Sequence, residues 1–368
     1  MITCDIQTAL APAADKPAPM AIGALPLRIL IVTDAWEPQV NGVVRTLKTT
    51  IGHLRDLGQE VEVVEPGAFR TIPCPTYPEI RLSLWPRSLL LQRITRFMPD
   101  VVHVATEGPL GQAARAIARR LDIPLTTAYH TRFPEYVQAR FRIPLSWTYA
   151  YLRRFHNASR AVLVPTTVVK RDLQARGFRH LRLWSRGVDH RVFYPRDGQR
   201  LDGAPPIFLY VGRVAVEKNI DAFLQLDLPG TKWVVGEGPE LPRIRKQYPG
   251  VRFLGVLTQD ELAKVYSGAD VFVFPSKTDT FGLVLIEALA CGCPVAAYPV
   301  TGPLDVIGDS PAGVLDHDLK AACLRALQIP RSVALAHARK FTWEAASRQF
   351  LDHLRQAVRQ GAANGPAR

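Results

Sequence analysis

The stretch VFVFPSKTDTFGLVLIEALACGCPVAAYP, residues 271–299, contains a complete strand–helix–strand unit. An apolar run of strand length ends at Ser276, a polar loop follows, and a helix is predicted to begin near Thr280–Gly282. A second apolar run, PVAAYP (294–299), comes directly after this helix. Two strands joined by a helix lie parallel in one sheet, so the stretch predicts a parallel sheet covered by helices.

The same alternation of Val/Ile/Leu-rich runs and amphipathic segments extends along most of the chain. The predicted strands are 28–34, 61–66, 101–106, 125–130, 161–166 and 181–185 in the first half, and 207–213, 232–238, 251–257, 271–276 and 294–299 in the second. Near-continuous apolar strands joined by helices are typical of doubly wound sheets. The predicted fold class is α/β, with two Rossmann-like, doubly wound parallel-sheet domains facing a cleft.

Composition and turn residues divide the 368 residues further. The Ala- and Pro-rich residues 1–26 lack the basic start and apolar core of a secretory signal, so we expect a flexible leader. The first domain is predicted over 27–195, a Pro- and Gly-containing linker over 196–206, and the second domain over 207–342. A helix over 343–368 is expected to pack back on the first domain.

Basic residues are concentrated in the first half of the chain. Residues 1–200 hold 28 Lys and Arg against 16 Asp and Glu, whereas residues 201–368 hold 18 against 17. Two segments, 86–97 and 140–160, interleave this charge with apolar and aromatic residues, as in helices that lie on anionic membranes. Half-buried helices with solvated arginines are the alternative. No nucleic-acid-binding motif accompanies the charge, so nucleic acid is not an expected partner.

Cysteine usage and the absence of long apolar runs bound the location of the protein. The five cysteines are an odd number, and Cys291 and Cys293 stand too close for an ordinary disulfide, which favours a reducing, cytoplasmic location. No apolar run approaches the roughly 18–20 residues that cross a bilayer. The D-x-D-like Asp316-His317-Asp318 lies far from the other motifs, so no catalytic metal and no cofactor are expected.

The loop and helix after Ser276 are predicted to bind an anion. Free amides at a helix start bind anions, and Gly282 lets a phosphate approach the backbone. Asp279 lies just before this start and Glu287 about a turn inside it, so one carboxylate can hold the sugar hydroxyls of a nucleotide sugar and the other its ribose hydroxyls. An N-terminal Asp favoured by the helix dipole and a solvated Glu are the alternative. A carboxylate inside an apolar run needs a partner, as Glu287 does. The donor contacts are predicted to include Thr280, Phe281 and Leu283.

A second motif, VGRVAVEKN (211–219), supplies the matching cations. Arg213 is predicted at a strand end and Lys218 at the next helix start, so both can bind one diphosphate and stabilise it as a leaving group. Ordinary surface cations are the alternative. Gly42 and Gly236 are expected to let the backbone approach the donor. The chain contains neither G-x-G-x-x-G nor G-x-x-x-x-G-K-[ST], so a nicotinamide cofactor and a Walker phosphate loop are not expected.

His130, in TTAYHTRFP (126–134), follows another predicted strand. In open parallel sheets ligands bind beyond the carboxyl ends of the strands, so His130 is a candidate contact to the transferred sugar. A core histidine with satisfied hydrogen bonds is the alternative.

Together these segments resemble the retaining, GT-B-fold glycosyltransferases of family four. The E-x7-E element of that family corresponds to Asp279-x7-Glu287, and its G-R-x-x-x-E-K element to Gly212, Arg213, Glu217 and Lys218. The resemblance implies that Asp279 and His130 contact the sugar, Glu287 the ribose, and the two cations the diphosphate. It also implies a metal-independent reaction with retained configuration. Asp at position 279, where the family has Glu, leaves the identity of the sugar open.

Finer likeness points to a subgroup of the family. The segments 74–84, 97–111, 128–137, 181–189 and 276–282 are similar to sulfoquinovosyl- and glycosyl-diacylglycerol synthases and to GDP-mannose-dependent α-mannosyltransferases. The resemblance implies transfer from a UDP-sugar to a lipid such as diacylglycerol, at the inner face of the cytoplasmic membrane. A GDP-mannose-dependent mannosyltransferase acting on a glycolipid or polysaccharide, and a non-catalytic nucleotide-sugar or membrane-binding protein, are the alternatives. No acidic base is apparent in the first half, so in the family's manner the departing phosphate is expected to accept the proton.

Overall fold

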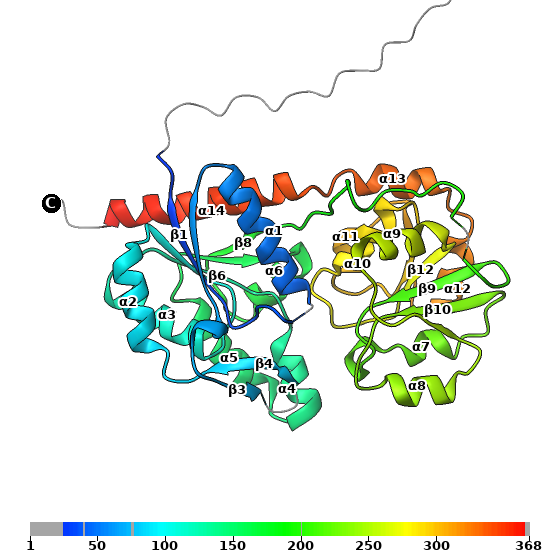
Figure 1. Cartoon of the computed structure of the whole chain (residues 1–368), viewed down its shortest axis with the longest axis horizontal. Helices are drawn as coiled ribbons and strands as arrows, with labels where there is room; N and C mark the ends of the chain where they lie inside the picture. Colours follow the sequence, from blue (N-terminus) through cyan, green and yellow to red (C-terminus); the bar gives the residue numbers. More distant parts are fainter. Residues whose placement is uncertain (1–24, 40, 75–76, 200, 365–368) are drawn as a thin grey trace, which may run out of the picture.

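The computed structural model describes residues 25–39, 41–74, 77–199 and 201–364, so the predicted leader lies almost entirely outside the described residues. Two α/β lobes lie side by side along the long axis of the molecule (Figure 1). Each lobe is built on its own six-stranded sheet. The predicted pair of doubly wound α/β domains is confirmed.

The sheet of the first lobe is parallel throughout, in the order β2-β1-β5-β6-β7-β8. Its strands are β1 (Arg28–Val32), β2 (Glu60–Val64), β5 (Val101–Val104), β6 (Leu125–Ala128), β7 (Ala161–Val164) and β8 (Leu181–Leu183). Its helices are α1 (Gly42–Asp56), α2 (Arg87–Phe97), α3 (Pro109–Arg120), α4 (Phe133–Phe141), α5 (Leu145–His156) and α6 (Thr167–Ala175). The central strands β5, β6 and β7 are buried at every position, as expected for a sheet covered on both faces.

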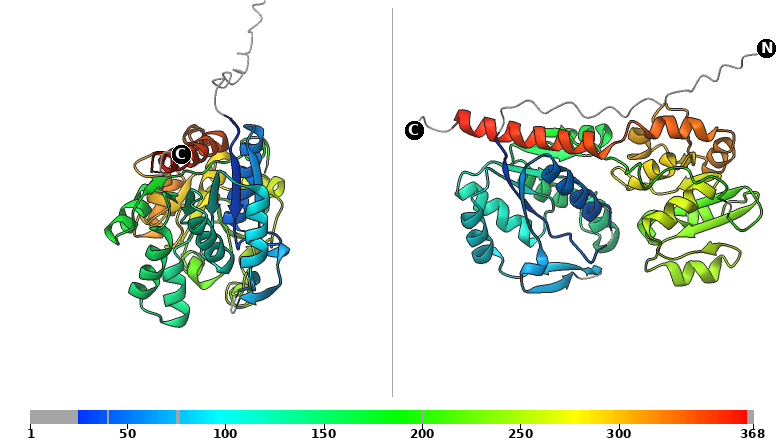
Figure 2. Two further views of the ribbon diagram at one scale, coloured as in Figure 1. Left: turned by 90° about the vertical axis from the view of Figure 1, so that its left-hand side faces the viewer. Right: turned by 45° about the horizontal axis from the view of Figure 1, so that its top comes forward.

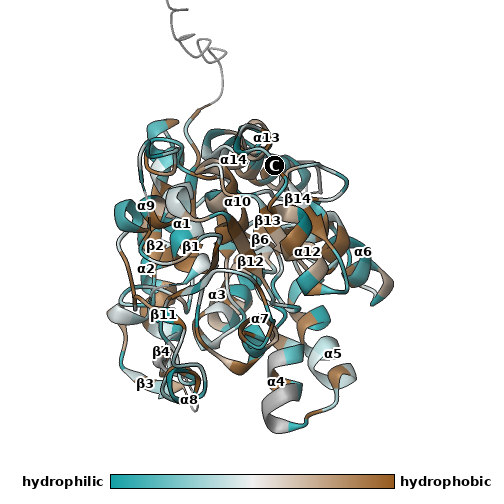
Figure 3. Ribbon diagram, turned by 90° about the vertical axis from the view of Figure 1, so that its right-hand side faces the viewer, coloured by the Kyte–Doolittle hydropathy of each residue, from teal (hydrophilic) through white to brown (hydrophobic). Residues whose placement is uncertain are grey.

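The sheet of the second lobe is also parallel and runs in the order β11-β10-β9-β12-β13-β14. Its strands are β9 (Ile207–Val211), β10 (Thr231–Val235), β11 (Arg252–Phe253), β12 (Val271–Phe274), β13 (Val295–Ala297) and β14 (Gly313–Leu315). Its helices are α7 (Asp221–Leu224), α8 (Leu241–Gln247), α9 (Gln259–Gly268), α10 (Leu283–Ala290), α11 (Pro303–Val306), α12 (Leu319–Ala326) and α13 (Arg331–Ala338), with a short 3-10 turn, η2, at Val216–Lys218. In Figure 3 the ribbon around β12 and β13 of this sheet, near the centre of the view, is strongly hydrophobic.

In both sheets the order in which strands are added reverses next to the first strand. In the first lobe the chain leaves β1 for β2 on one side and later returns to β5 on the other; in the second lobe it does the same around β9, between β10 and β12. Ligands of open α/β sheets bind at such switch points, beyond the carboxyl ends of the two strands. The topology therefore provides two candidate binding edges.

Two segments differ from the sequence expectation. The run predicted as a strand over 251–257 forms only the two-residue β11. The Leu254 amide still donates to the Val234 carbonyl at 3.0 Å, and the chain then turns at Gly255, which has φ +70°. A hairpin not expected from the sequence joins β3 (Thr71–Cys74) to β4 (Tyr77–Ser83) after the 3-10 turn η1 (Pro66–Ala68). Its local pairing is antiparallel and outside the main sheet, so the parallel-sheet pattern does not reveal it.

The chain passes between the lobes twice, and the two passages run together. Val188 pairs with Thr342 in an isolated parallel bridge, and a Cβ on Gly187 would lie 2.2 Å from the Trp343 backbone nitrogen. Val188 and Phe193 already pack in the core of the second lobe, upstream of the predicted linker. The connection is therefore a close pair of segments, not one free linker.

The long helix α14 (Trp343–Asn364) returns to the first lobe and runs along it (Figures 1 and 2). It contacts α1 and strands β5, β6 and β7. Phe350 and Leu354 are fully buried there with Ile29 and Leu47. Helix α14 thus completes the hydrophobic core of the first lobe.

Candidate functional site

A cleft of about 2010 Å³ lies between the two lobes. The segments after β1 and β5 line it from the first lobe, and those after β9 and β12 line it from the second, so both switch points open into the same space. All the predicted site residues line it: Gly42, His130, Arg213, Lys218, Gly236, Asp279, Thr280, Phe281, Gly282, Leu283 and Glu287.

Helix α10 presents an uncapped N terminus to this cleft. The helix begins at Leu283, and no side chain caps it; Gly282 precedes it with φ 82°. A Cβ on Gly282 would lie 3.2 Å from the Phe274 ring, so both the left-handed backbone and the packing favour glycine. The first amides of the helix are therefore available to an anion.

Helix α1 begins opposite, on the other lobe. Asn41 caps it by accepting hydrogen bonds from the backbone amides of Val43 and Val44, both at 3.0 Å. A Cβ on Gly42 would lie 3.7 Å from Leu283 Cδ1, at the start of α10. The two helix N termini therefore approach each other closely across the cleft.

Gly236 lines the cleft but also has a packing role. It has φ +126°, and a Cβ there would lie 2.0 Å from the carbonyl oxygen of Gly212. The turn that carries Arg213 is held further by the Tyr210 hydroxyl, which donates to the Arg213 carbonyl at 2.8 Å. Glycine at 236 thus lets the turn after β10 approach the turn after β9.

Lys218 and Asp279 form an ion pair on the second-lobe wall of the cleft, with 2.6 Å between Nζ and Oδ1. The other oxygen of Asp279, Oδ2, is buried without a hydrogen-bond partner in the described part of the chain. A buried carboxylate oxygen without a donor is unfavourable. The arrangement therefore leaves an acceptor for a ligand hydroxyl beside a lysine.

His130 stands on the facing wall as an uncharged ring. Arg186 Nη2 lies 3.3 Å from His130 Nδ1, and because an arginine only donates, Nδ1 must be the acceptor and Nε2 carries the proton. Burial, and then the Arg186 cation, lower the pKa of His130 well below its usual range. Nε2 is buried and has no partner among the described residues. His130 thus holds a donor for a ligand oxygen.

The backbone of His130 also bridges the cleft. The Thr280 hydroxyl, in the loop before α10, donates to the His130 carbonyl oxygen at 2.6 Å. This bond places the His130 ring beside the loop that carries Asp279.

Glu287 is almost fully buried on α10, and its partner comes from the other lobe. Arg45, on α1, lies 2.5 Å from the carboxylate (Nη1 to Oε1), and the Tyr266 hydroxyl lies 3.5 Å from its other oxygen. Burial raises the pKa of Glu287, and the Arg45 cation opposes that rise. The sequence indicated that Glu287 needs a partner but gave no sign that Arg45 supplies it.

No acidic base was apparent in the first half of the sequence; in the structure Asp34 and Glu107 both line the cleft, and each is engaged by other residues. Asp34 accepts from the Thr106 hydroxyl at 2.9 Å and from the Leu110 amide at 2.9 Å, so it holds the start of α3 in place. Glu107 Oε1 lies 3.1 Å from Nε2 of the buried His156. Asp34 ends one predicted strand and Glu107 directly follows another, and that position was the signal for them.

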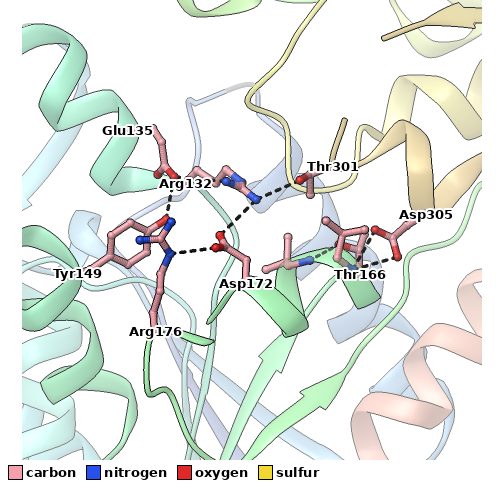
Figure 4. Close-up of polar contacts among 10 residues, drawn as sticks. Arg132, Glu135, Tyr149, Thr166, Asp172, Arg176, Thr301 and Asp305 are labelled. Carbon is pink, nitrogen blue, oxygen red and sulfur yellow. Dashed lines mark hydrogen bonds and ion pairs between the residues drawn. The ribbon is translucent and has the colours of Figure 1, made fainter. Parts of the chain in front are cut away.

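A polar cluster ties the lobes together at one side (Figure 4). Arg132 Nη2 donates to the Thr301 hydroxyl at 3.0 Å and lies 3.4 Å from Asp172. Asp305, from the second lobe, accepts from the Thr167 amide at 2.7 Å, at the start of α6 of the first lobe, which Thr166 caps. Two of these contacts therefore cross between the lobes.

The D-x-D-like segment lies away from the cleft and has structural partners. Asp318 caps α12, accepting from the Lys320 and Ala321 amides, and Asp316 pairs with Arg325. Among the described residues no group of three or more His, Cys, Asp or Glu is placed to hold a metal ion. Cys291 and Cys293 are fully buried core residues.

Comparison with known families yields two matches that together span most of the chain. Residues 40–192 match the family described as Glycosyltransferase Family 4, and residues 205–328 match the family described as Glycosyl transferases group 1.

The chain is similar to several characterised proteins. It is 34% identical to the sulfoquinovosyl transferase SQD2 of Arabidopsis thaliana, over 78% of this chain and 62% of that protein, so it spans less than two thirds of the plant protein's length. It is 31% identical to the GDP-mannose-dependent alpha-mannosyltransferase of Mycobacterium tuberculosis, over 90% of this chain and 97% of the relative. It is 28% identical to the alpha-monoglucosyldiacylglycerol synthase of Streptococcus pneumoniae, over 82% and 78%.

Solved structures share the fold at lower identity. The sucrose-phosphate synthase of Thermosynechococcus elongatus superposes with a TM-score of 0.72 at 22% identity, covering 90% of this chain and 99% of that one. HepE of Anabaena, solved with UDP, superposes with a TM-score of 0.64 at 16% identity, covering 89% and 99%. The two-lobed arrangement is therefore the GT-B fold.

Proposed function

This chain belongs to glycosyltransferase family 4, and we propose that it transfers a sugar from a UDP-sugar to a lipid acceptor such as diacylglycerol, with retention of anomeric configuration. The observation that carries the donor part is a pair of buried, unpartnered polar atoms on facing walls, Asp279 Oδ2 and His130 Nε2. A sugar between them has hydroxyls that donate to the first and accept from the second.

The remaining proposed donor contacts come from the second-lobe wall of the cleft. The uncapped start of α10 binds the diphosphate, with Arg213 and Lys218 beside it in the cleft. Glu287 binds the ribose hydroxyls. As the bond to the sugar breaks, these cations and amides stabilise the charge that develops on the leaving diphosphate. No metal and no cofactor takes part in this proposal, and a phosphate oxygen accepts the proton of the acceptor hydroxyl.

The first lobe supports a lipid acceptor. Ile80, Leu82, Phe133 and Tyr151 give its side of the cleft an apolar lining. Next to Tyr151 on α5, the Trp147 side chain is 72% exposed. A large exposed aromatic on a helix that carries Arg153 and Arg154 in its last turn is suited to the interface of an anionic membrane.

This surface supports a peripheral position on the inner face of the cytoplasmic membrane. No helix in the described ranges has an apolar stretch long enough to cross a bilayer. Contact through α5 brings the apolar side of the cleft to the lipid, so an acceptor can enter without leaving the membrane.

A GDP-mannose-dependent mannosyltransferase is the second candidate. It is supported by the mycobacterial relative, which this chain covers almost completely. The acceptor is then a glycolipid or a polysaccharide.

A donor and transfer assay tests these proposals. Thermal shifts with UDP-, GDP- and ADP-sugars identify the base, and transfer of the best sugar onto diacylglycerol in anionic vesicles is then followed by mass spectrometry and by NMR of the anomeric proton. We expect a UDP-sugar to bind and an α-linked glycolipid to form. Preference for GDP-mannose selects the second candidate, and saturable binding without sugar release indicates a non-catalytic binding protein.

A further inference from the structure

Arg186 is a buried cation without a carboxylate partner. It follows β8, lines the cleft, and is only 4% exposed. It forms no ion pair with any residue in the described ranges. Its neighbours are the Trp184 ring, 4.2 Å from the guanidinium carbon, and the His130 ring.

The surroundings of Arg186 do not offset its charge. Burial alone lowers the pKa of Arg186 to about 9, and no acidic group opposes this effect. The Arg186 cation in turn contributes to lowering the pKa of His103 and His130, so both rings stay neutral. A buried charge is unfavourable without a counter-ion, and this cluster holds one positive charge with no negative charge.

The hydrogen bonds of Arg186 leave one edge of its guanidinium available. Nη1 donates to the carbonyls of Trp184 at 2.7 Å and Ser185 at 3.0 Å, which uses both of its N–H groups. Nη2 gives one N–H to His130 Nδ1. One N–H on Nε and one on Nη2 have no partner among the residues that the structure describes. The Nε–Nη2 edge is the one that binds carboxylates and phosphates side-on.

The position of Arg186 connects it to the donor site. Its partner His130 accepts a hydrogen bond from Thr280 through the backbone, and Thr280 belongs to the loop between Asp279 and α10. Arg186 is thus separated from this loop by a single residue, although it belongs to the other lobe.

We propose that Arg186 binds an oxyanion of the donor substrate through this edge and thereby receives its missing counter-charge. The oxyanion is either a phosphate of the leaving diphosphate or an acidic group on the transferred sugar. The inference rests on the proposed function and adds a cation from the first lobe to the donor site.

Binding measurements on Arg186→Lys and Arg186→Gln test the proposal. Lysine keeps the positive charge but lacks the two-donor edge of the guanidinium, and glutamine lacks both the charge and this edge. The matched control is Arg182→Gln, an exposed arginine on β8 outside the cleft. Isothermal titration compares a nucleoside diphosphate, UDP or GDP, with its neutral-sugar and uronic-acid conjugates, and circular dichroism confirms that each variant is folded.

We expect both Arg186 variants to lose at least tenfold in affinity, with the control unchanged. A loss shared by all three ligands assigns the diphosphate, and a loss confined to the uronic-acid conjugate assigns the sugar. Affinities within twofold of wild type for every ligand in a folded Arg186→Lys protein overturn the inference and leave the proposed function standing. Failure of the wild-type protein to bind any of the ligands overturns both.

Discussion

Arg45 and Glu287 form an ion pair across the cleft, 2.5 Å from Nη1 to Oε1, although 242 residues separate them in the sequence. The arginine lies on α1 of the first lobe and the glutamate on α10 of the second. The carboxylate that we propose binds the ribose is therefore paired with a cation of the opposite lobe. On this proposal, donor binding moves or shares Arg45, so nucleotide binding is coupled to the relative position of the lobes.

Replacing Arg45 by methionine is expected to destabilise the protein by about 3 kcal/mol at neutral pH, since removal of one partner leaves a buried carboxylate and such losses are roughly 3–5 kcal/mol. The cost shrinks in acid, because the raised pKa of Glu287 lets it take up a proton and lose its charge. Urea unfolding of Arg45→Met, Glu287→Gln and the double variant measures the coupling. Strictly additive losses would show that the pair does not interact.

Lys218→Ala is expected to lower the rate of transfer by about 10²–10³-fold, because it removes a cation from the leaving diphosphate. The protein should stay folded, since Lys218 is partly exposed on the cleft wall. Lys246→Ala, an exposed lysine on α8 of the same lobe, is the matched control. Wild-type turnover in Lys218→Ala would remove this residue from the site.

Acid is expected to destabilise the protein partly through His103. Burial, followed by the Arg186 cation, lowers the pKa of His103 to about 3. The folded state then binds fewer protons than the unfolded state, so this contribution to stability is complete above pH 6.5 and is lost as the pH falls. The loss is about 1.4 kcal/mol per pH unit for one such group.

Urea unfolding at pH 7 and pH 5 measures this effect. His103→Asn keeps a donor or acceptor for the Thr126 hydroxyl, which lies 2.9 Å from His103 Nδ1, and should flatten the pH dependence. His190→Asn, at an exposed position, should leave it as in wild type. An equal change in the free energy of unfolding between pH 7 and pH 5 in all three proteins would contradict the prediction.

Asp305→Ala is expected to open the cleft. The carboxylate accepts from the Thr167 amide at the start of α6 in the opposite lobe, and loss of such an acceptor at a helix start costs about 1 kcal/mol. Small-angle X-ray scattering of the ligand-free variant should therefore show a larger radius of gyration, which saturating nucleotide reverses. Asp309→Ala, in the same lobe, serves as the control, and identical scattering of Asp305→Ala and wild type would rule out a role in closure.

Trp147→Ser is expected to weaken binding to anionic vesicles several-fold while nucleotide binding stays unchanged, because the side chain lies on the exposed face of α5 and not in the cleft. Co-sedimentation with vesicles of phosphatidylglycerol measures the effect. Val216→Ser, an exposed apolar residue of the second lobe, is the control. Equal sedimentation of wild type and Trp147→Ser would argue against this face as the membrane contact.

Local sequence patterns were sufficient to predict the two parallel sheets and the residues on the second-lobe wall of the cleft. Apolar runs such as 271–274 mark buried strands because a sheet covered on both faces excludes polar residues. Asp279, Gly282 and Glu287 are recognisable because one loop and one helix carry all three. These features can be predicted because the residues that form them lie within a few positions of one another in the sequence.

Tertiary structure alone decided which residues of the first lobe meet that wall. Arg45 reaches Glu287 and Thr280 reaches His130 only because two separately wound sheets turn their switch points to one cleft. For the same reason Arg186 lies buried at that cleft with no counter-ion in the described part of the chain. Coulombic and hydrogen-bond energies depend on distance in space, so residues more than a hundred positions apart carry no local signal of their pairing. The sequence pattern by itself determined the two lobes and the polar residues of the second-lobe wall. The packing of the lobes determined which charged residues of the first lobe face that wall.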